Sequence, residues 1–418
     1  MVSGGSRRRV VVTGMGALTP LGLKVDELWE GLVAGRSGVG NITLCDTTGF
    51  PCTIAGEVKG FDPRHYMEHK DARRMARFSQ LAVAATQEAL GQAALNLAGE
   101  DRGRCGVLLG NGNGGFPTVE EECQVLFTKG GMRVSPLFMP MQLPNMAASQ
   151  IAIHFGLQGY NTTVVTACAA GTHAIGEAAE VIRRGAADVM VTGGTEAGIS
   201  RLGLAGFCTM RALTHRNEEP ARASRPFDAL RDGFVPAEAA GILVLESWEH
   251  ALQRGAPILA EVAGYGVSCD AWHIVAPDSD GSGAARAIKL ALENAGVSTT
   301  DVDYINAHGT STPLNDAIET MAIKRIFGED AYRIPISSTK SMIGHSLGAA
   351  GGVEAIACVK TINQGVIHPT INYENQDPDC DLDYTPNVAR PALVDVALSN
   401  SFGFGGQNAC LVLKRFTG

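Results

Sequence analysis

Strand-like runs that end in glycine-rich loops alternate with helices rich in small residues along this chain. The run 10–16 is β-branched and ends at Gly14 and Gly16, and the run 105–115 ends in the loop GNGNGG. Short apolar runs of this kind are typical of strands buried on both faces, and the helices between them indicate a layered α/β fold. The helices that we expect are 77–95, 169–184, 284–295 and 347–362.

The same order of parts occurs in both halves of the chain. In the first half, a strand with a glycine-rich exit precedes a helix, a second strand and a strand-loop-helix unit at 163–184. The second half repeats this order, in the runs 258–266, 284–295, 304–312 and 336–356. We therefore expect two similar halves, 1–255 and 256–418.

Composition narrows the class of protein. Of 418 residues, 18% are charged and 45% are hydrophobic, so we expect a large buried surface, partly between subunits. A net charge of −9 argues against nucleic acid as a partner. No apolar run reaches the ~20 residues that span a bilayer, and the start of the chain has no signal-peptide pattern, so we expect a cytoplasmic protein with no membrane partner. The cysteines form no CxxC zinc or redox pair.

One cysteine, Cys168, lies at a predicted strand-to-helix junction. The strand 162–166 breaks at Ala-Cys-Ala-Ala-Gly, and the helix that follows runs to Arg184, with Gly185 as its C-terminal cap. A thiol at the positive end of a helix dipole, beside unpaired N–H groups, is expected to have a lowered pKa and to act as a nucleophile. The alternative is a buried structural cysteine.

Two histidines follow predicted strands in the second half. His308 lies in NAHGTSTPLND, and His345 lies with Lys340 in STKSMIGHSLGAAGG. Strand-exit loops at one sheet edge commonly form sites, and two neutral imidazoles can donate hydrogen bonds to an enolate or oxyanion while a thiolate forms an acyl-enzyme. Taken singly, either histidine is more often a structural residue.

A further glycine-rich segment, NSFGFGGQN, lies near the C-terminus. Its glycines would let the backbone N–H of Phe404 approach a ligand, while the rings of Phe402 and Phe404 would wall or gate a pocket. The alternative is an ordinary β-bulge between two core strands.

In this order, the segments VVTACAAG, NAHGTSTPLND, STKSMIGHSLGAAGGVE and SNSFGFGG resemble the β-ketoacyl-[acyl-carrier-protein] synthase I/II family, and most closely its synthase II members. The resemblance spans nearly the whole chain, from VVVTGMGALTPLG through ASRPFDALRDGF to NACLVLKR. It implies a thiolase-like fold with duplicated βαβαβαββ halves in a five-layered α-β-α-β-α core, usually as a homodimer. It also implies an acyltransferase of type II fatty acid synthesis, which condenses an acyl-enzyme with malonyl-acyl carrier protein and needs no cofactor.

The resemblance also implies roles for single residues. Cys168 would carry the acyl group, and His308 and His345 would promote decarboxylation and condensation. Lys340 would support the histidines. The backbone N–H groups of Cys168 and Phe404 would form the oxyanion hole. The remaining implied residues are the gate Phe402 and Phe404, the acidic network Asp316, Glu319 and Glu354, and a structural Na⁺ or K⁺ site near Asn306, Glu354 and Asn400.

The family's carrier protein is acidic, so docking on this acidic chain would need local basic residues. The segment HKDARRMAR and three further positions supply them: Lys70, Arg73, Arg74, Arg77, Lys129, Arg133 and Arg211. The alternative is an ordinary solvated helix face.

Four positions depart from the family pattern. Asn113 stands where the wall of the acyl pocket is usually apolar. A buried amide needs partners, so either its neighbours satisfy it or the acyl group is not an ordinary fatty chain. The other departures are Ala237 and Ala239 in place of glycines and Tyr160 in place of proline.

Three other functions remain open for the sequence. A ketosynthase of polyketide or polyene synthesis would use the same residues on another chain. A non-catalytic chain-length partner of a heterodimer typically lacks the nucleophile, which Cys168 supplies here. A cysteine hydrolase would use water as the acceptor and would not depend on malonyl-carrier.

Overall fold

The computed structural model describes residues 8–418, and the expected lack of a signal peptide concerns residues that lie partly outside this range. Ten strands form one hydrogen-bonded array in the order β10-β9-β13-β14-β8-β1-β7-β6-β4-β5. The strands of the first half are β1 (Val10–Leu18), β4 (Cys105–Gly110), β5 (Asn161–Val164), β6 (Val189–Glu196) and β7 (Ala239–Ser247). Those of the second half are β8 (Ala260–Cys269), β9 (Tyr304–Asn306), β10 (Ile336–Ser337), β13 (Val396–Gly403) and β14 (Gln407–Lys414).

The array consists of two five-stranded sheets with the same topology. If the strands of each half are numbered along the chain, both sheets have the order 3-2-4-5-1. The fifth strand of each half, β7 or β14, runs antiparallel to both of its neighbours. Between the sheets, β1 and β8 pair only through Val11 with Glu261 and Val12 with Ala260. The expected duplication is therefore present in the strand order itself.

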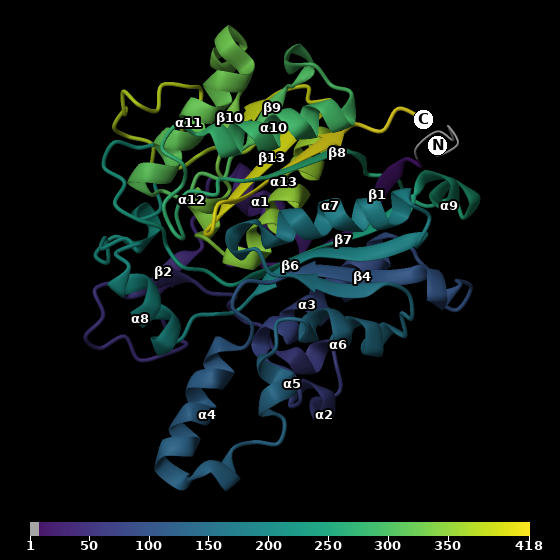
Figure 1. The fold of residues 1–418 in the computed structure, drawn as a ribbon, viewed down its shortest axis with the longest axis vertical. Coiled ribbons are helices and arrows are strands. Elements are labelled where there is room, and N and C mark those ends of the chain that lie inside the picture. Colours follow the sequence, from purple (N-terminus) through teal and green to yellow (C-terminus); the bar gives the residue numbers. More distant parts are fainter. Residues whose placement is uncertain (1–7) are drawn as a thin grey trace.

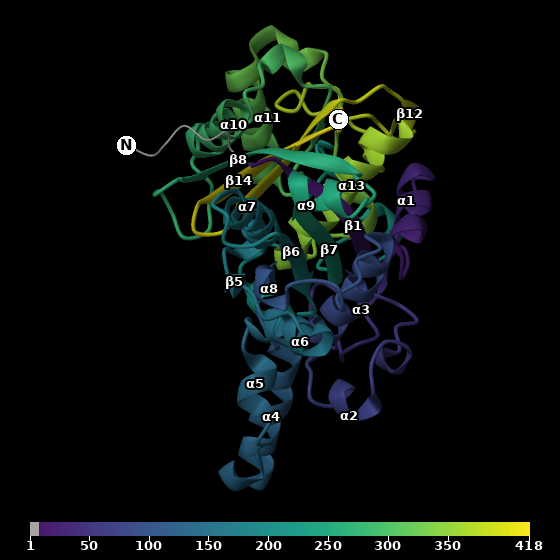
Figure 2. The ribbon, with the colours of Figure 1, turned by 90° about the vertical axis from the view of Figure 1, so that its right-hand side faces the viewer.

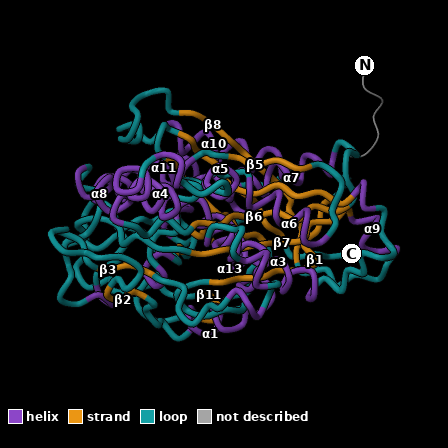
Figure 3. Tube along the Cα trace, turned by 90° about the horizontal axis from the view of Figure 1, so that it is seen from below, coloured by secondary structure: helices purple, strands orange, loops and turns teal. Residues whose placement is uncertain are grey.

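Helices complete five layers, α-β-α-β-α, around these sheets (Figure 1). The outer helices α3 (Arg77–Gln92) and α6 (Met146–Phe155) pack on the first sheet, and α10 (Ser282–Ala295) and α11 (Pro313–Phe327) cover the second. The middle layer consists of α7 (Ala170–Arg183) and α13 (Ala350–Gln364), which contact each other and strands of both sheets. Seen from below, the strands run between helices on both sides (Figure 3).

Paired glycines let one outer helix approach each sheet closely. In β1, a Cβ on Gly16 would lie 1.9 Å from the carbonyl oxygen of Ala85 in α3. In β8, a Cβ on Gly266 would lie 2.2 Å from the carbonyl oxygen of Ala287 in α10. Gly14 and Gly16 lie inside β1, because this strand continues to Leu18. The prediction that these two glycines mark the end of the first strand is therefore wrong. The two halves thus share a packing solution as well as a strand order.

A helical arm projects from the first half, made of α4 (Phe116–Lys129), a short 3₁₀ turn (Gly131–Arg133) and α5 (Phe138–Gln142) (Figures 1 and 2). Large apolar side chains on it face solvent, with Phe127 82% and Met132 98% exposed. The remaining elements are α1 (Val25–Val33), α2 (His69–Ala72), α8 (Arg201–Thr209), α9 (Trp248–Gln253), α12 (Lys340–Ile343), β2 (Val39–Asn41), β3 (Ile54–Gly56), β11 (Val366–Ile367) and β12 (Arg390–Pro391). Among the described helices, none has the length and apolarity needed to cross a membrane.

Candidate active site

Loops from both halves meet around one cavity of about 620 Å³. Cys168 comes from the connection between β5 and α7, His308 follows β9, and His345 follows α12. The predicted Phe404 lies in the turn between β13 and β14 and also lines the cavity. The remaining predicted lining residues are Asn113, Arg211 and Phe402. The residues that the sequence places in four separate motifs are therefore neighbours in space.

The junction around Cys168 has the expected strand-turn-helix form. A 3₁₀ turn, Ala167–Ala169, joins β5 to α7, and Ala167 adopts the left-handed φ of 49° that turns the chain sharply. Beyond the end of α7, Gly185 has a φ of 75°, as expected of a C-terminal cap. The backbone N–H groups of Cys168 and Phe404 both act on the thiol, since each of them lowers its pKa.

The expected lowering of the Cys168 pKa is not found. Burial raises the pKa of this thiol to about 12, although Lys340 and the two N–H groups act in the opposite direction. Cys168 is 5% exposed and lines the same cavity as Phe404 and the two histidines. Desolvation of the thiolate therefore outweighs the effect of the helix N-terminus on its pKa.

His308 is held by a buried lysine. The Lys340 ammonium lies 3.4 Å from His308 Nδ1 and also donates a short hydrogen bond to Glu354. Because Lys340 donates to Nδ1, the neutral ring carries its proton on Nε2. Burial, and after it the charge of Lys340, keeps the pKa of His308 well below its usual value. His308 is therefore a neutral donor.

His345 reaches the same tautomer by another route. The backbone N–H of Leu347 donates to His345 Nδ1 at 3.3 Å, so the proton lies on Nε2, which is buried and has no hydrogen-bond partner in the described part of the chain. Burial lowers the pKa of His345 well below its usual value. The rings of His308 and His345 are 5.5 Å apart, centroid to centroid, and the Phe402 ring is 5.7 Å from that of His308.

The acidic residues of the predicted network lie behind His308. Glu319 accepts hydrogen bonds from the backbone N–H groups of His308 and Gly309, both at 2.8 Å, and burial raises its pKa to about 7. Asp316 is fully buried and accepts the backbone N–H of Phe227 at 2.8 Å. These contacts fix the backbone of the loop that carries the imidazole.

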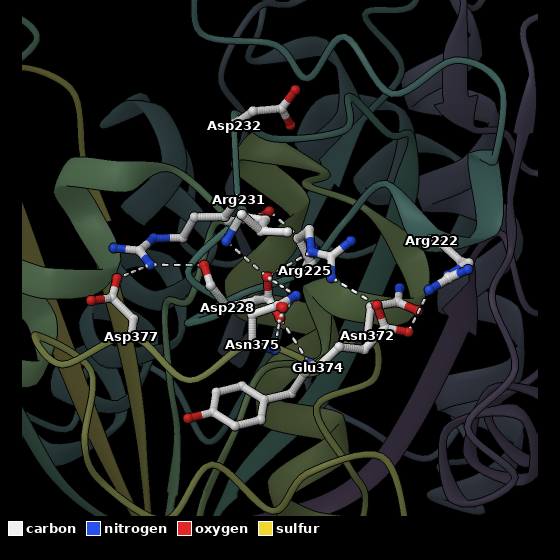
Figure 4. A network of polar contacts seen from close by, with 12 residues as sticks. Arg222, Arg225, Asp228, Arg231, Asp232, Asn372, Glu374, Asn375 and Asp377 are labelled. Atoms are coloured by element: carbon white, nitrogen blue, oxygen red, sulfur yellow. Dashed lines mark hydrogen bonds and ion pairs between the residues drawn. The ribbon is translucent and has the colours of Figure 1, made fainter.

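A second polar network, which the sequence did not predict, supports the same loop (Figure 4). The guanidinium of Arg231 donates to the backbone carbonyls of Thr312 and Pro313 at 3.1 and 2.9 Å and pairs with Asp377. Asp228 is fully buried and accepts the backbone N–H groups of Glu374 and Asn375. The motif ASRPFDALRDGF was visible as part of the resemblance, but its partners lie about 80 to 150 positions away in sequence.

Among residues 8–418, four buried oxygen atoms around the predicted cation site have no hydrogen-bond partner: Asn306 Oδ1, Glu354 Oε2, Ser399 Oγ and Asn400 Oδ1. Oxygen atoms, one of them charged, are the ligands that alkali cations prefer, so the donor set fits Na⁺ or K⁺. Among the described residues, no group of three or more His, Cys, Asp or Glu side chains could hold a metal ion.

The departing residue Asn113 lies in the cavity wall, and its Nδ2 is buried without a partner. Its backbone N–H donates to Glu196, a buried carboxylate that the sequence did not single out. Burial raises the pKa of Glu196 to about 7, while hydrogen bonds from three backbone N–H groups act to lower it. Ala237 is buried beside the His345 backbone, whose carbonyl oxygen accepts its N–H at 3.0 Å. Ala239 begins β7, and the Tyr160 ring packs against the guanidinium of Arg184 at the C-terminal end of α7, away from Cys168.

The predicted docking residues are exposed at separate places. Lys70, Arg73 and Arg74 lie on or just after α2, whereas Lys129 and Arg133 lie at the tip of the arm. Arg211 is exposed at the cavity. Arg77, in contrast, forms an ion pair with the buried Glu238 and is committed to the fold.

Comparisons with known proteins agree with this geometry. Residues 7–251 match the family model "Beta-ketoacyl synthase, N-terminal domain", and residues 259–374 match "Beta-ketoacyl synthase, C-terminal domain". A 3-oxoacyl-[acyl-carrier-protein] synthase 2 of Synechocystis is 51% identical over 98% of this chain and 99% of its own length.

Two solved structures are also similar. "The ishigamide ketosynthase/chain length factor" has a TM-score of 0.92 at 40% identity and covers 99% of this chain and 100% of its own. A type II polyketide ketosynthase in complex with its acyl-carrier protein has a TM-score of 0.90 at 38% identity, with the same coverage. The thiolase-like ketosynthase fold is confirmed, and this chain belongs to the β-ketoacyl synthase family of acyltransferases.

Proposed function

We propose that this protein is an elongating 3-oxoacyl-[acyl-carrier-protein] synthase of type II fatty acid synthesis. The observation that carries the proposal is the convergence of Cys168 with two neutral imidazoles on one cavity. The curated relative from Synechocystis, which is 51% identical over nearly the full length, supports this substrate class.

In the first step, the sulfur of Cys168 attacks the carbonyl carbon of an acyl-carrier thioester. The backbone N–H groups of Cys168 and Phe404 stabilise the oxyanion, an assignment supported by the way both groups lower the pKa of the thiol. The bond from carbon to the carrier's sulfur breaks, and the carrier leaves as a thiol with the proton that Cys168 gives up. The product is an acyl-enzyme thioester.

In the second step, malonyl-carrier loses its carboxylate as CO₂, and the electron pair of that bond forms an enolate. The Nε2–H groups of His308 and His345 donate hydrogen bonds to the thioester oxygen, where this negative charge develops. The enolate carbon then attacks the acyl carbon, and the bond to Cys168 breaks, so that the 3-oxoacyl-carrier is released and the sulfur leaves as a thiolate that takes up a proton from water. Phe402 and Phe404 act as the gate of this pocket.

The test is incubation with acyl-carriers of graded length and malonyl-carrier, followed by intact-mass and product analysis. We expect an acyl adduct on the wild-type protein and none on Cys168→Ala, which should keep its melting temperature because it replaces one small apolar side chain. An adduct on that variant, or a free acid as the main product, would contradict the proposal.

A second candidate is a ketosynthase of a polyketide or polyene pathway. The unpartnered Nδ2 of Asn113 in the cavity wall favours a chain with a hydrogen-bond acceptor. The two similar solved structures are named as the ishigamide ketosynthase/chain length factor and as a type II polyketide ketosynthase with its acyl-carrier protein. Faster turnover of 3-oxoacyl or polyenoyl chains than of saturated chains in the same assay would select it.

We propose acyl carrier protein as the partner and a cytoplasmic homodimer as the working form. The exposed apolar side chains of the arm and the free edge of β5, where Val165 is 54% exposed, support a partner subunit. Light scattering would detect the dimer, and a monomer at micromolar concentration would contradict it. We also propose that the halves divide at 255/256, between α9 and β8.

We further propose a structural Na⁺ or K⁺ ion among the four unpartnered oxygens near Asn306, Glu354 and Asn400. Such an ion would neutralise charge and satisfy acceptors, not take part in bond making. A melting temperature that is higher in KCl or NaCl than in choline chloride at equal ionic strength, with the difference lost in Asn400→Ala, would support the site.

A further inference from the structure

One buried carboxylate links two walls of the cavity. Glu196, the last residue of β6, is fully buried and accepts three backbone N–H groups. The donors are Gly112 at 2.8 Å, Asn113 at 3.2 Å and Gly348 at 3.2 Å. None of the roles proposed so far uses this residue.

The three donors belong to two different loops. Gly112 and Asn113 follow β4 and form the wall that would receive an acyl chain, and both line the cavity. Gly348 lies in the turn 347–349, directly after Leu347, whose N–H fixes the tautomer of His345. Glu196 therefore hydrogen-bonds directly to the wall of the acyl pocket. It is also linked to His345 through Gly348, which it holds, and the adjacent Leu347, which contacts the imidazole.

Packing around this carboxylate leaves no space for adjustment. A Cβ on Gly112 would lie 2.6 Å from Glu196 Oε2, and a Cβ on Gly348 would lie 2.5 Å from the backbone nitrogen of Gly112. The two loops thus touch each other directly, and the carboxylate oxygens lie where both backbones converge. A carboxylate can accept all three N–H groups, whereas a carboxamide has one acceptor oxygen and an NH₂ group that opposes the remaining donors.

We propose that Glu196 is a positioning residue that keeps the acyl-pocket wall and the His345 loop in register. A long acyl chain contacts the wall of the acyl pocket. Its carbonyl carbon is therefore aligned with the enolate only when the distance between this wall and the His345 imidazole is maintained. A short chain does not reach the wall and is less sensitive. This inference rests on the proposed condensing activity and adds a residue that acts through others.

The test compares Glu196→Gln and Glu196→Asp with a matched control, Glu57→Gln, in the full-length protein. Glu57 is 3% exposed and accepts the backbone N–H groups of Thr43 and Leu44, in a loop that does not line the cavity. We would measure single-turnover acylation and condensation with butyryl- and dodecanoyl-carrier, with melting temperatures alongside.

We expect Glu196→Gln to lower the dodecanoyl-to-butyryl ratio of condensation rates by about tenfold, since small displacements at a reacting centre cost this much or more. Glu196→Asp, which keeps the charge, should recover part of the ratio, and Glu57→Gln should leave it unchanged. If Glu196→Gln matches Glu57→Gln in this ratio while the wild type condenses both chains, the inference is wrong. A wild type that forms no 3-oxoacyl product would instead overturn the proposed function, and this inference with it.

Discussion

The ammonium group of Lys340 is completely enclosed, and the Glu354 carboxylate is the anion that offsets it. Each of the two side chains is 1% exposed. Burial raises the pKa of Glu354, and the charge of Lys340 acts against that rise. Removal of one partner would leave a buried charge with no counterion, which costs far more than loss of a surface pair.

We predict that Lys340→Met lowers the free energy of unfolding by about 3 to 5 kcal/mol. It should also slow malonyl decarboxylation, because His308 Nδ1 loses the donor that fixes its tautomer. Urea unfolding and CO₂ release measure the two effects. The double variant Lys340→Met/Glu354→Leu should regain most of the stability and none of the activity.

Lys360 offers a matched control in α13, where it pairs with Asp26, whose side chain is 84% exposed. Its replacement by Met should cost less than about 1 kcal/mol. Equal stability losses in Lys340→Met and Lys360→Met would contradict the view that the buried pair is special.

Single residues also show how much of the site can be predicted from the sequence. The place of Cys168 at a strand-to-helix junction follows from a local pattern, and so does Gly185 as a cap. The thiol's pKa does not, because it depends on burial by the Phe404 turn and by His345, which are 236 and 177 positions away in sequence. The local sequence predicts the helix N-terminus that would lower the pKa of the thiol. It does not predict the desolvation that raises this pKa by more.

At the scale of elements, the end of β13 packs against the turn that carries Cys168. A Cβ on Gly403 would lie 2.7 Å from the carbonyl oxygen of Thr166 and 3.3 Å from the backbone nitrogen of Cys168. The absence of a side chain at Gly403 therefore lets the end of β13 lie directly against the turn that carries Cys168.

We predict that Gly403→Ala separates β13 from this turn, lowers stability by about 1 to 3 kcal/mol and reduces acylation of Cys168 more than tenfold. Thermal unfolding and intact-mass measurement of the acyl adduct test both effects. Gly91→Ala in α3, where nothing lies within 4 Å of the new Cβ, is the control and should not lower either quantity. Normal acylation of Gly403→Ala would count against the oxyanion hole.

The elements themselves were largely predictable. The helices 77–95 and 284–295 match α3 and α10 within a few residues, because their small apolar residues recur with helical spacing. The prediction that the glycines of β1 end this strand was wrong. They allow a helix to approach the sheet closely, and this contact depends on the tertiary structure, which a local pattern does not show. The Arg231 network was missed for the same reason: charge pairs between distant segments leave no periodic signal.

At the scale of the whole molecule, the net charge is negative, but exposed basic residues of two separate elements lie toward one end. The helix α2 with Arg73 and Arg74, and the arm tip, lie toward one end of the molecule, and α10 lies toward the other (Figures 1 and 2). An acidic partner would be drawn to the basic end despite the overall charge.

We predict that Arg73→Glu/Arg74→Glu raises the apparent KM for acyl-carrier several-fold and leaves turnover of small thioester mimics unchanged. Steady-state kinetics at two salt concentrations would measure this, since the difference should shrink as salt screens the charges. Lys289→Glu in α10 is the control at the opposite end. Equal effects on carrier and mimic would show that the two arginines do not dock the carrier.

Acid stability depends on a cluster far from the cavity. Glu246 in β7 is fully buried; burial by itself would raise its pKa, but hydrogen bonds from Arg254, His250 and Thr13 lower it to about 2. Its usual value is 4.5, so the stabilisation is present above that pH and is lost as pH falls toward 2.

We predict that this carboxylate contributes roughly 3 kcal/mol at neutral pH. Glu246→Gln should therefore be destabilised at pH 7 and show a smaller further loss between about pH 5 and pH 3 than the wild type. Melting temperatures across this range test the sign. Glu249→Gln, whose side chain is 58% exposed, should follow the wild-type curve.

The proposed catalytic groups are divided between two sheets, and these sheets pair only through two residues of β1 and two of β8. This division has a consequence for synthesis of the chain. The ribosome releases the half with the thiol first, and both imidazoles emerge only with the last third of the chain. A nascent chain, or one broken between the sheets, would hold the cysteine without the two imidazoles to which we assign the decarboxylation of malonyl thioester. Catalytic competence is thus the last property this chain acquires during synthesis, and a stalled or truncated product would not consume malonyl thioester.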